Sequence, residues 1–181
     1  MKKNQKNIIL GVTASIAIYK SCSLIRRLRE CGFAVHVVMT KEAQELIKPV
    51  VFQSLSGNRV YSGEIFDAPD TWEIEHIALA SKADLILIAP ATANIIAKLS
   101  AGICDDLLSC TVCASKAQVL VAPAMNENMY NNKITQGNIA KLKSSGLNFV
   151  LPRKGLLACG VTGVGCLAET DQIIKEVKKL L

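Results

Sequence analysis

Polar side chains follow two of the most apolar runs in the sequence, and each group opens with a proline. Thr92 and Asn94 lie in Pro90-Ala91-Thr92-Ala93-Asn94, after the run at 83–89. Asn126 lies in Pro123-Ala124-Met125-Asn126-Glu127-Asn128-Met129-Tyr130, after the run at 118–122. Threonine and asparagine are also common helix caps, so either group alone has an ordinary structural explanation. Because proline holds each exit rigid, the repeated pattern favours one shared site.

A turn of small residues near the start of the chain could hold a phosphate. Gly11-Val12-Thr13-Ala14-Ser15-Ile16-Ala17 ends the apolar run at 8–12 and leads into a predicted helix. It lacks the three glycines of the dinucleotide fingerprint. Its two hydroxyls and the free backbone N–H groups of a helix start suit a single phosphate monoester. An ordinary turn with Ser15 as a helix cap explains the same residues equally well.

Two histidines could take part in acid–base chemistry, and they lie in different settings. His76 lies among acidic residues in Glu73-Ile74-Glu75-His76-Ile77-Ala78. A neighbouring carboxylate would raise its pKa and orient its ring. A lone histidine of this kind is nevertheless more often a surface or packing residue than a catalyst. His36 alternates with Val35 and Val37 on a predicted strand, which indicates a structural role.

The chain contains seven cysteines, an odd number, and they are scattered. This pattern indicates free thiols in a reducing compartment rather than a secreted disulfide framework. Five are predicted to be small buried residues: Cys22, Cys31, Cys104, Cys110 and Cys113. Cys159 differs because it lies in a glycine-rich segment, 155–166. A thiol in an exposed, mobile loop suits a lid that carries a proton donor, and Cys166 is its rival in the same segment.

Strand-like and helix-like segments alternate along the whole chain. The predicted strands are 8–12, 34–39, 83–89, 118–122 and 148–151. The predicted helices are 16–31, 41–55 with a break at Pro49, 74–81, 93–101, 105–114, 134–145 and 171–181. This alternation predicts a single domain over residues 1–181, an α/β fold in which helices cover both faces of a Rossmann-like (flavodoxin-like) doubly wound parallel sheet. Irregular structure is predicted at 56–73 and at a glycine-rich loop, 153–168. Prolines 90 and 123 are expected to close their strands.

The sheet determines where the chemistry should lie. Ligands of open α/β sheets bind beyond the carboxyl ends of the strands. The turn at 11–17, Thr40 after the second strand, and the two proline-led segments all meet that criterion. We therefore expect them to surround one site.

The composition excludes some functions and favours others. The formal net charge is +6, from 21 Lys and Arg residues against 15 Asp and Glu residues. Much of the positive charge lies in two predicted helices, and aromatic residues are scarce, so a nucleic-acid surface is not expected. No apolar run approaches the roughly 20 residues that cross a bilayer, and the basic start lacks the apolar stretch of a signal peptide. A cytoplasmic protein without membrane partners is expected.

Four segments, in order along the chain, resemble motifs of the homo-oligomeric flavin-containing cysteine decarboxylases. His76 followed by Ile77 matches the active-site histidine of that family. Residues 90–94 resemble its P-A-S-A-N segment, and residues 123–129 match P-x-M-N-x-x-M in full. Leu157-Ala158-Cys159-Gly160 matches the substrate-clamp cysteine of its coenzyme A branch. The likeness covers essentially the whole chain from Ile9, and the combination is specific.

The resemblance implies FMN as the cofactor. Its phosphate would lie at Ser15, Ile16 and Ala17. The rest of the flavin site would be lined by Thr40, Thr92, Ala93, Asn94 and Ala124. The resemblance also implies a homotrimer or a trimer-based dodecamer, with flavin and substrate between subunits. His76 would then act on a flavin bound mainly by a neighbouring subunit.

The implied reaction converts 4′-phosphopantothenoylcysteine, a small-molecule substrate, to 4′-phosphopantetheine in coenzyme A biosynthesis. A β-thiol carboxylate cannot lose CO₂ directly, because the carbanion has nowhere to delocalise. Oxidation by the flavin gives a thioaldehyde, loss of CO₂ gives an enethiolate, and reduction completes the cycle. Asn126 and Met129 would bind substrate, with Asn126 on the carboxylate. His76 would assist proton transfer and Cys159 would protonate the enethiolate. No metal is implied, and a separate ligase would supply the substrate.

Three positions depart from the pattern of the family. Ala14 stands where a glycine is common, and Thr92 replaces a serine but keeps the hydroxyl. Cys166 stands where an arginine is often found, so a basic contact to the substrate is missing there. Arg153 or Lys154 could serve the substrate phosphate instead.

Four other functions remain open from the sequence. A decarboxylase of peptide C-terminal cysteine shares the flavin and asparagine motifs but lacks the clamp cysteine, so Cys159 argues against it. A flavin prenyltransferase is disfavoured by the segment 123–129. A non-catalytic regulatory flavoprotein would carry long acidic or low-complexity extensions. A flavodoxin-like electron carrier fits the fold but has no use for His76, Asn126 or a cysteine lid.

Overall fold

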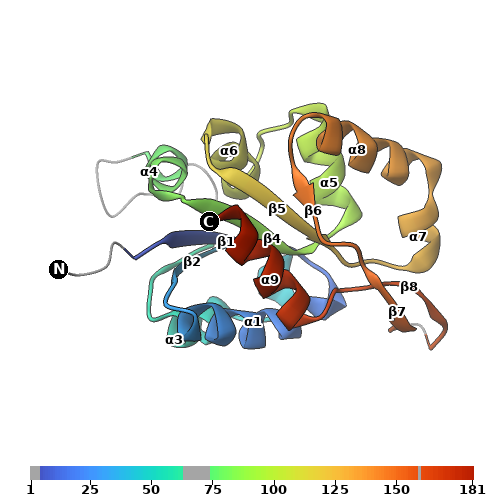
Figure 1. Cartoon of the computed structure of the whole chain (residues 1–181), viewed down its shortest axis with the longest axis horizontal. Helices are drawn as coiled ribbons and strands as arrows, with labels where there is room; N and C mark the ends of the chain where they lie inside the picture. The colour runs from blue at the N-terminus through green and yellow to red at the C-terminus, as the bar shows by residue number, and fades with distance from the viewer. Residues whose placement is uncertain (1–4, 63–73, 159) are drawn as a thin grey trace.

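A central parallel sheet runs through the molecule in the computed structural model, which describes residues 5–62, 74–158 and 160–181 (Figure 1). The sheet strands of the described chain are β1 (Asn7–Val12), β2 (Ala34–Met39), β3 (Val60–Tyr61), β4 (Leu85–Ala91), β5 (Gln118–Pro123) and β6 (Asn148–Phe149). The proposed clamp residue Cys159, and 63–73 of the segment expected to be irregular, lie outside the described residues.

The strand order of this sheet is β3-β2-β1-β4-β5-β6, and every adjacent pair is parallel. This is the order of the Rossmann fold, whereas the flavodoxin order places the third strand inside the sheet. The doubly wound parallel sheet predicted from the sequence is therefore confirmed, and its order is resolved. From β1 the strands are added toward one edge of the sheet as far as β3, and from β4 they are added toward the other edge. The strand order therefore reverses between β1 and β4, and such folds bind their ligands at this point.

Helices cover both faces of the sheet. The helical elements of the described chain are η1 (Ile16–Ile18), α1 (Tyr19–Glu30), α2 (Ala43–Leu46), α3 (Pro49–Ser56), α4 (Glu75–Lys82), α5 (Ala93–Ala101), α6 (Leu107–Ala114), α7 (Glu127–Asn131), α8 (Lys133–Ser144) and α9 (Thr170–Leu180). Pro49 starts α3, as the sequence indicated. The short helix α7 was not predicted.

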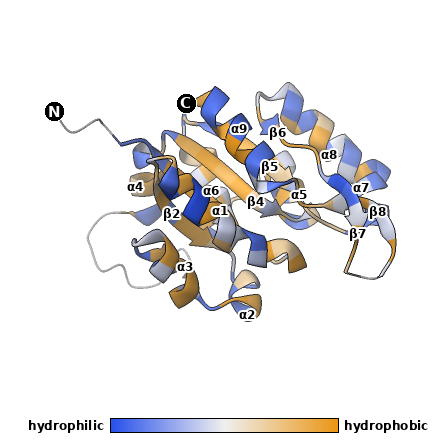
Figure 2. Ribbon diagram, turned by 60° about the horizontal axis from the view of Figure 1, so that its bottom comes forward, coloured by the Kyte–Doolittle hydropathy of each residue, from blue (hydrophilic) through white to orange (hydrophobic). Residues whose placement is uncertain are grey.

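The inner strands are apolar on both faces, which is why they are readable as continuous apolar runs. Along β4, Leu87 packs into a cluster with side chains of α1, α3 and α9, and Ile88 packs into a second cluster with α4, α5, α6 and α8. Figure 2 shows β4 as a hydrophobic strip through the middle of the molecule. Both side chains are fully buried. Burial of apolar surface contributes about 25 cal/mol of stabilising free energy per Å², so burial on both faces of the strand holds its ends in place.

The two prolines expected to close strands lie within them. β4 continues through Pro90 to Ala91, β5 includes Pro123, and Ala91 pairs with Pro123. The register shifts between Ile88 and Ala91, so the ladder is irregular where the proline lacks an N–H. Pro123 is the last residue of β5, as expected, whereas the expectation that Pro90 ends β4 was wrong, because the strand continues to Ala91.

A second sheet lies outside the first. β7 (Arg153–Leu156) and β8 (Thr162–Cys166) form an antiparallel hairpin beside α7 (Figure 1). The sequence predicted an irregular loop over 153–168, and this was wrong, because the glycines of β8 hide the apolar alternation of a strand. The two-residue strand β3 was also missed, because a pair of residues shows no period.

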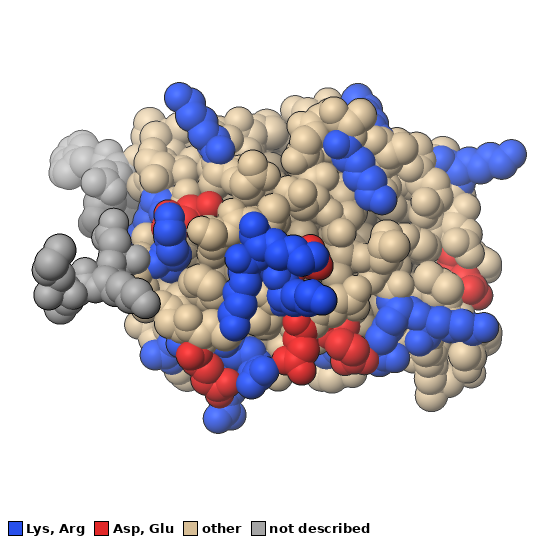
Figure 3. All heavy atoms as spheres, in the orientation of Figure 1, with Lys and Arg blue, Asp and Glu red and all other residues tan. Residues whose placement is uncertain are grey.

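Charged side chains are spread over the surface. In Figure 3, basic side chains gather over the middle of the view, where α9 lies, with acidic side chains between and below them. Arg27 of α1 reaches Asp171 of α9 at 2.8 Å, and Lys179 pairs with Glu176 within α9. Within the described residues, no helix combines the length and the apolar character that crossing a membrane requires.

Candidate active site

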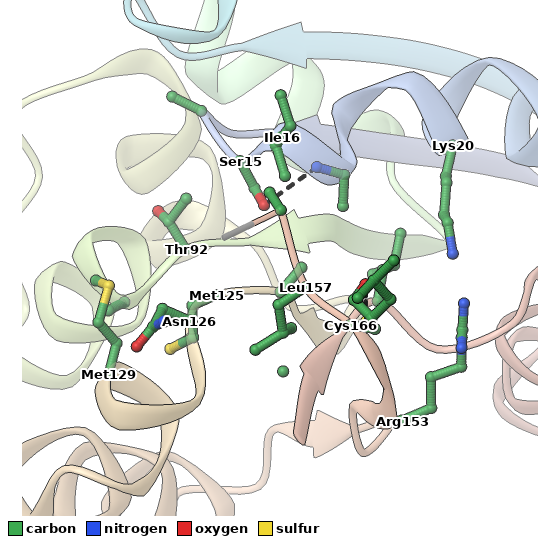
Figure 4. Close-up of a pocket in the computed structure, with 18 of the residues that line it drawn as sticks. Ser15, Ile16, Lys20, Thr92, Met125, Asn126, Met129, Arg153, Leu157 and Cys166 are labelled. Atoms are coloured by element: carbon green, nitrogen blue, oxygen red, sulfur yellow. Dashed lines mark hydrogen bonds between the residues drawn. The ribbon is translucent and has the colours of Figure 1, made fainter. Parts of the chain in front are cut away.

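A cavity of about 740 Å³ opens at the carboxyl ends of β1, β4 and β5, with the β7–β8 hairpin across from them (Figure 4). Its volume is within the range of sites for small organic ligands. Most of its surface is apolar, and a few polar side chains project into it. This is the position that the parallel sheet predicts for a ligand.

The exit of β1 supplies a helix start. Ser15 is the N-cap of η1, and its Oγ accepts a hydrogen bond from the Ala17 N–H at 3.4 Å. Ile16 projects from the same turn and is 65% exposed. α1 continues directly from η1, so the positive end of a long helical segment faces the cavity. Both interpretations of this turn are present together: Ser15 caps the helix, and the turn lines a cavity.

A buried hydroxyl joins the exits of β1 and β4. Thr13 Oγ1 donates to the Pro90 carbonyl at 2.8 Å and accepts from the Thr92 N–H at 3.1 Å. Ser21 of α1 donates to the Ala89 carbonyl at 2.9 Å. These bonds fix the two turns relative to each other. Thr92 caps α5 through the Ile95 N–H at 3.4 Å, and it also lines the cavity.

The exit of β5 positions Asn126. This residue is the N-cap of α7, and its Oδ1 accepts a hydrogen bond from the Asn128 N–H at 2.9 Å. The side chain is exposed toward the cavity, with Met129 beside it one turn along α7 (Figure 4). Because the carbonyl oxygen accepts this bond, the amide nitrogen is the donor that could hold an anion.

The hairpin is joined to the β5 exit by backbone contacts. The Met125 N–H donates to the Gly165 carbonyl at 3.0 Å, and the Val164 N–H donates to Glu127 Oε1 at 2.9 Å. Gly165 has φ of +153°, and a Cβ on it would overlap the Met125 carbonyl oxygen. Only glycine allows this close approach, which therefore depends on a single residue.

Most of the predicted site residues are brought together. The predicted residues that line the cavity are Ser15, Ile16, Ala17, Thr92, Ala93, Ala124, Asn126 and Met129. Cys159 lies outside the described residues, but its neighbours Ala158 and Gly160 both line the cavity. The structure thus brings the first, third and fourth strand exits of the sequence prediction to one place.

Three predicted residues lie elsewhere. Thr40 is half-buried after β2, with its N–H donating to the Val12 carbonyl at 3.1 Å, and Asn94 is exposed on α5. His76 is half-buried in the first turn of α4. Figures 1 and 2 show α4 on the opposite side of the molecule from the hairpin. A single chain therefore does not place His76 in this cavity.

The structure also adds residues that sequence reasoning missed or left open. Lys20 of α1 and Arg153 of β7 both line the cavity. Lys20 could have been identified from its spacing in the sequence, because it follows the candidate phosphate turn by one helical turn. The sequence offered Arg153 and Lys154 as alternatives, and the strand at 153–156 shows that Arg153 lines the cavity.

Other titratable groups lie away from the cavity. Burial and the nearby positive charge of Lys82 lower the pKa of His36, which supports its structural role. Cys104 and Cys113 are exposed, contrary to the expectation of buried cysteines. Burial, followed by hydrogen bonding to Cys104, raises the pKa of Cys113 to about 11. Among the described residues, no group of three or more His, Cys, Asp or Glu side chains is arranged to hold a metal ion.

The strand order and the cavity together define a Rossmann-like α/β protein with a ligand-sized cavity at the carboxyl edge of its sheet, and comparison with known proteins shows its family. The sequence matches the Flavoprotein family over residues 1–181. It is 44% identical to a probable phosphopantothenoylcysteine decarboxylase of Streptococcus mutans, covering 97% of this chain and 99% of that one. The chain belongs to the flavoprotein family, and this membership indicates a flavin cofactor.

Three further proteins, one similar in sequence and two similar in fold, describe the range of relatives. The chain is 43% identical to the coenzyme A biosynthesis bifunctional protein CoaBC of Bacillus subtilis, covering 97% of this chain but only 43% of that protein. The fold matches a PPC decarboxylase variant complexed with pantothenoylaminoethenethiol, with a TM-score of 0.87 and 30% identity over 97% of this chain and 98% of that one. It also matches the FMN binding protein AtHal3, with a TM-score of 0.82 and 30% identity over 97% of this chain and 96% of that one.

Proposed function

We propose that this chain catalyses the FMN-dependent decarboxylation of 4′-phosphopantothenoylcysteine to 4′-phosphopantetheine. One observation carries the proposal: Asn126, the helix-start turn at Ser15 and both neighbours of Cys159 surround a single cavity. The relatives named above as decarboxylases of this substrate, or as coenzyme A biosynthesis proteins, support the choice of reaction.

The residues around the cavity fit a flavin mononucleotide. The turn at 15–17 offers a hydroxyl and a helix start for one phosphate, which suits a mononucleotide. Small side chains at Ala17, Ala93 and Ala124 leave a smooth wall on which a ring system could lie. When bound, the flavin supplies a two-electron acceptor that activates the substrate for loss of CO₂.

Asn126 and Cys159 act on the two ends of the reacting group. The Asn126 amide nitrogen donates to the substrate carboxylate and holds it in one orientation, while its Oδ1 is kept in place by the Asn128 N–H. Met129, 50% exposed, packs against the apolar part of the substrate. Cys159 delivers the proton to the enethiolate after CO₂ has left, and the hairpin closes over the site to exclude water.

His76 acts in the cavity of a neighbouring subunit. Its place on α4, away from the cavity of its own chain, is what a site shared between subunits requires. We propose a homotrimer or a trimer-based dodecamer, in which the imidazole of one subunit moves the thiol proton of a substrate bound by the next. Thr40 and Asn94 would contribute to the flavin site in the same assembly.

We propose that a ligase activity supplies the substrate in the cytoplasm. The chain spans about 43% of the length of the bifunctional CoaBC relatives. A ligase that joins cysteine to 4′-phosphopantothenate would be a functional partner of this chain.

The decisive experiment combines a spectrum with an assay. We expect the purified protein to show the visible absorbance of oxidised flavin and to release CO₂ from 4′-phosphopantothenoylcysteine. A colourless protein that takes up no flavin on reconstitution would contradict the proposal. Turnover of a peptide with C-terminal cysteine, with none of the phosphorylated substrate, would assign the chain to the peptide branch.

Three variants separate the proposed roles. Cys159→Ser should still release CO₂ but accumulate the enethiol, visible by mass spectrometry. Asn126→Asp and His76→Asn should both bind flavin and fail to bleach it with substrate. Complete turnover by Cys159→Ser, or normal bleaching by either of the others, would remove that residue from the mechanism.

A further inference from the structure

One end of the cavity carries two positive charges. Lys20 and Arg153 are the charged side chains that line it, and no carboxylate is found among the lining residues that the structure describes. Figure 4 shows the two side chains pointing toward one another, on the opposite side of the cavity from Thr92 and Met129. Two converging cations repel each other, and the Glu169 carboxylate that pairs with Arg153 does not line the cavity. The arrangement is therefore complementary to a negatively charged group of the ligand.

The position of Arg153 is built into the hairpin. Arg153 pairs with Cys166 across the two strands, and its Nε lies 2.6 Å from Glu169 Oε1. A Cβ on Gly155 would lie 2.6 Å from Arg153 Nη1 and 3.2 Å from Cys166 Sγ. The guanidinium thus occupies the space that a side chain at position 155 would fill. Because its Nε end faces Glu169, its terminal nitrogens are the donors that can face the cavity.

Lys20 approaches from the opposite wall. It belongs to the first turn of α1 and is half-buried beside the candidate phosphate turn. Its ammonium is a flexible point charge, whereas the guanidinium of Arg153 is a planar fork that binds two oxygens at once. A phosphate monoester presents enough oxygens for both groups.

We infer that Lys20 and Arg153 form the subsite for the 4′-phosphate of the substrate, an assignment that rests on the proposed function. The substrate is elongated, with a carboxylate at its reacting end and a phosphate at its other end. The cavity has the same polarity, with the Asn126 amide on one side and two cations on the other. The phosphate of the cofactor is accounted for by the helix start at Ser15, which leaves the cationic end for the substrate.

Paired substrates test this assignment on the holoprotein. We would measure kcat/KM of wild type for 4′-phosphopantothenoylcysteine and for its unphosphorylated analogue, and repeat both with Arg153→Gln and Lys20→Gln. Each variant should lose about 10- to 100-fold in kcat/KM for the phosphorylated substrate, mainly through KM, because a charge-assisted contact is lost. The analogue should react within about 3-fold of wild type. Arg153→Lys should recover only part of the loss.

Lys154→Gln is the matched control. It removes the same charge from the next residue of β7, which is exposed and does not line the cavity. It should leave both substrates unchanged within about 2-fold, as surface substitutions usually do.

Two outcomes would overturn the subsite, and a third would overturn the proposed function. Equal losses on both substrates would mean that Arg153 and Lys20 only position the hairpin or α1. A weaker affinity of the variants for FMN, with unchanged affinity for riboflavin in a fluorescence titration, would assign the two cations to the phosphate of the cofactor. Failure of wild type to turn over either substrate would remove the decarboxylase function, and this assignment with it.

Discussion

The two walls of the cavity are built in different ways. On one side, the exits of β1, β4 and β5 continue from strands that are buried on both faces, and the Thr13 hydroxyl ties the β1 exit to the β4 exit. On the other side, β7 and β8 pair only with each other, and Leu156 is 73% exposed. The sheet wall carries the proposed cofactor contacts, and the hairpin wall carries Arg153 and the neighbours of Cys159. The proposed cofactor contacts thus lie on the sheet wall, whereas the proposed substrate contacts are divided between the two walls, with Lys20, Asn126 and Met129 on the sheet side.

The sharpest way to break this separation is to push the hairpin away from the sheet. In Gly165→Ala, the added Cβ would overlap the Met125 carbonyl oxygen at a backbone angle that other residues rarely adopt. We expect turnover to fall about 100-fold or more, because a small displacement of catalytic groups has that cost. Flavin should remain bound, as judged by its visible spectrum.

Gly137→Ala provides the control for this variant. A Cβ at Gly137 of α8 meets no atom within 4 Å, and the backbone there is helical. It should leave turnover unchanged and stabilise the fold by about 0.5–1 kcal/mol. Loss of flavin from Gly165→Ala would show that the two walls are not separable.

The second variant attacks the sheet wall. Thr13→Val keeps the shape of the side chain but leaves the Pro90 carbonyl and the Thr92 N–H without their buried partner. At about 1–3 kcal/mol for each of the two unsatisfied groups, we expect a global loss of about 2–6 kcal/mol. Urea unfolding measures it. Thr162→Val on the exposed strand β8 should change stability by less than about 0.5 kcal/mol; a similar loss from both variants would contradict the comparison.

The third variant loosens the hairpin without steric overlap. Glu127→Ala removes the charged acceptor of the Val164 N–H. The expected cost is about 1.5–3 kcal/mol, felt as local opening rather than global unfolding. Hydrogen exchange of the β7 and β8 amides should therefore accelerate about 10-fold or more, while the amides of β4 keep their protection. Faster exchange throughout the sheet would show that the hairpin opens only when the whole protein unfolds.

The smallest expected effect is the pH dependence of stability that His36 of the central sheet causes. The pKa of His36 in β2 is held below its ordinary value of 6.5, so below pH 6.5 the unfolded chain binds a proton that the folded chain refuses. Stability should fall as the pH is lowered from about 6.5, by at most about 1.4 kcal/mol per pH unit. His36→Gln should flatten urea midpoints between pH 7 and 5. An unchanged slope in that variant would exclude His36 as the cause.

The sheet wall could be predicted from the sequence, and the hairpin wall could not. Strands such as β4 appear as uninterrupted apolar runs because both of their faces are buried. Since parallel strands end at the same edge, the residues after them could be assigned to one site, and Ser15, Thr92 and Asn126 do line one cavity.

The hairpin gave no such signal. β8 is mostly small residues, Thr162-Gly163-Val164-Gly165-Cys166, and its glycines serve contacts with Met125 and Glu127 that are distant in sequence. The choice between Arg153 and Lys154 was left open for a related reason. Arg153 faces the cavity only because of its pairing with Cys166, and a pairing partner cannot be read from local pattern. His76 lies away from this cavity in its own chain, and no pattern within one chain tests its proposed role in a neighbouring subunit.

The contact at Gly165 has a consequence for how specificity could be changed. It joins the hairpin to the rest of the protein chiefly through main-chain atoms, so it places few demands on the side chains between Pro152 and Leu167. A segment of that length from a relative with another substrate could be transplanted if it kept this glycine and a partner for Glu127. The same α/β fold would then carry interchangeable hairpins, each of which selects a different substrate. Enzymes for other thiol-containing carboxylic acids could be engineered by replacing this one short segment.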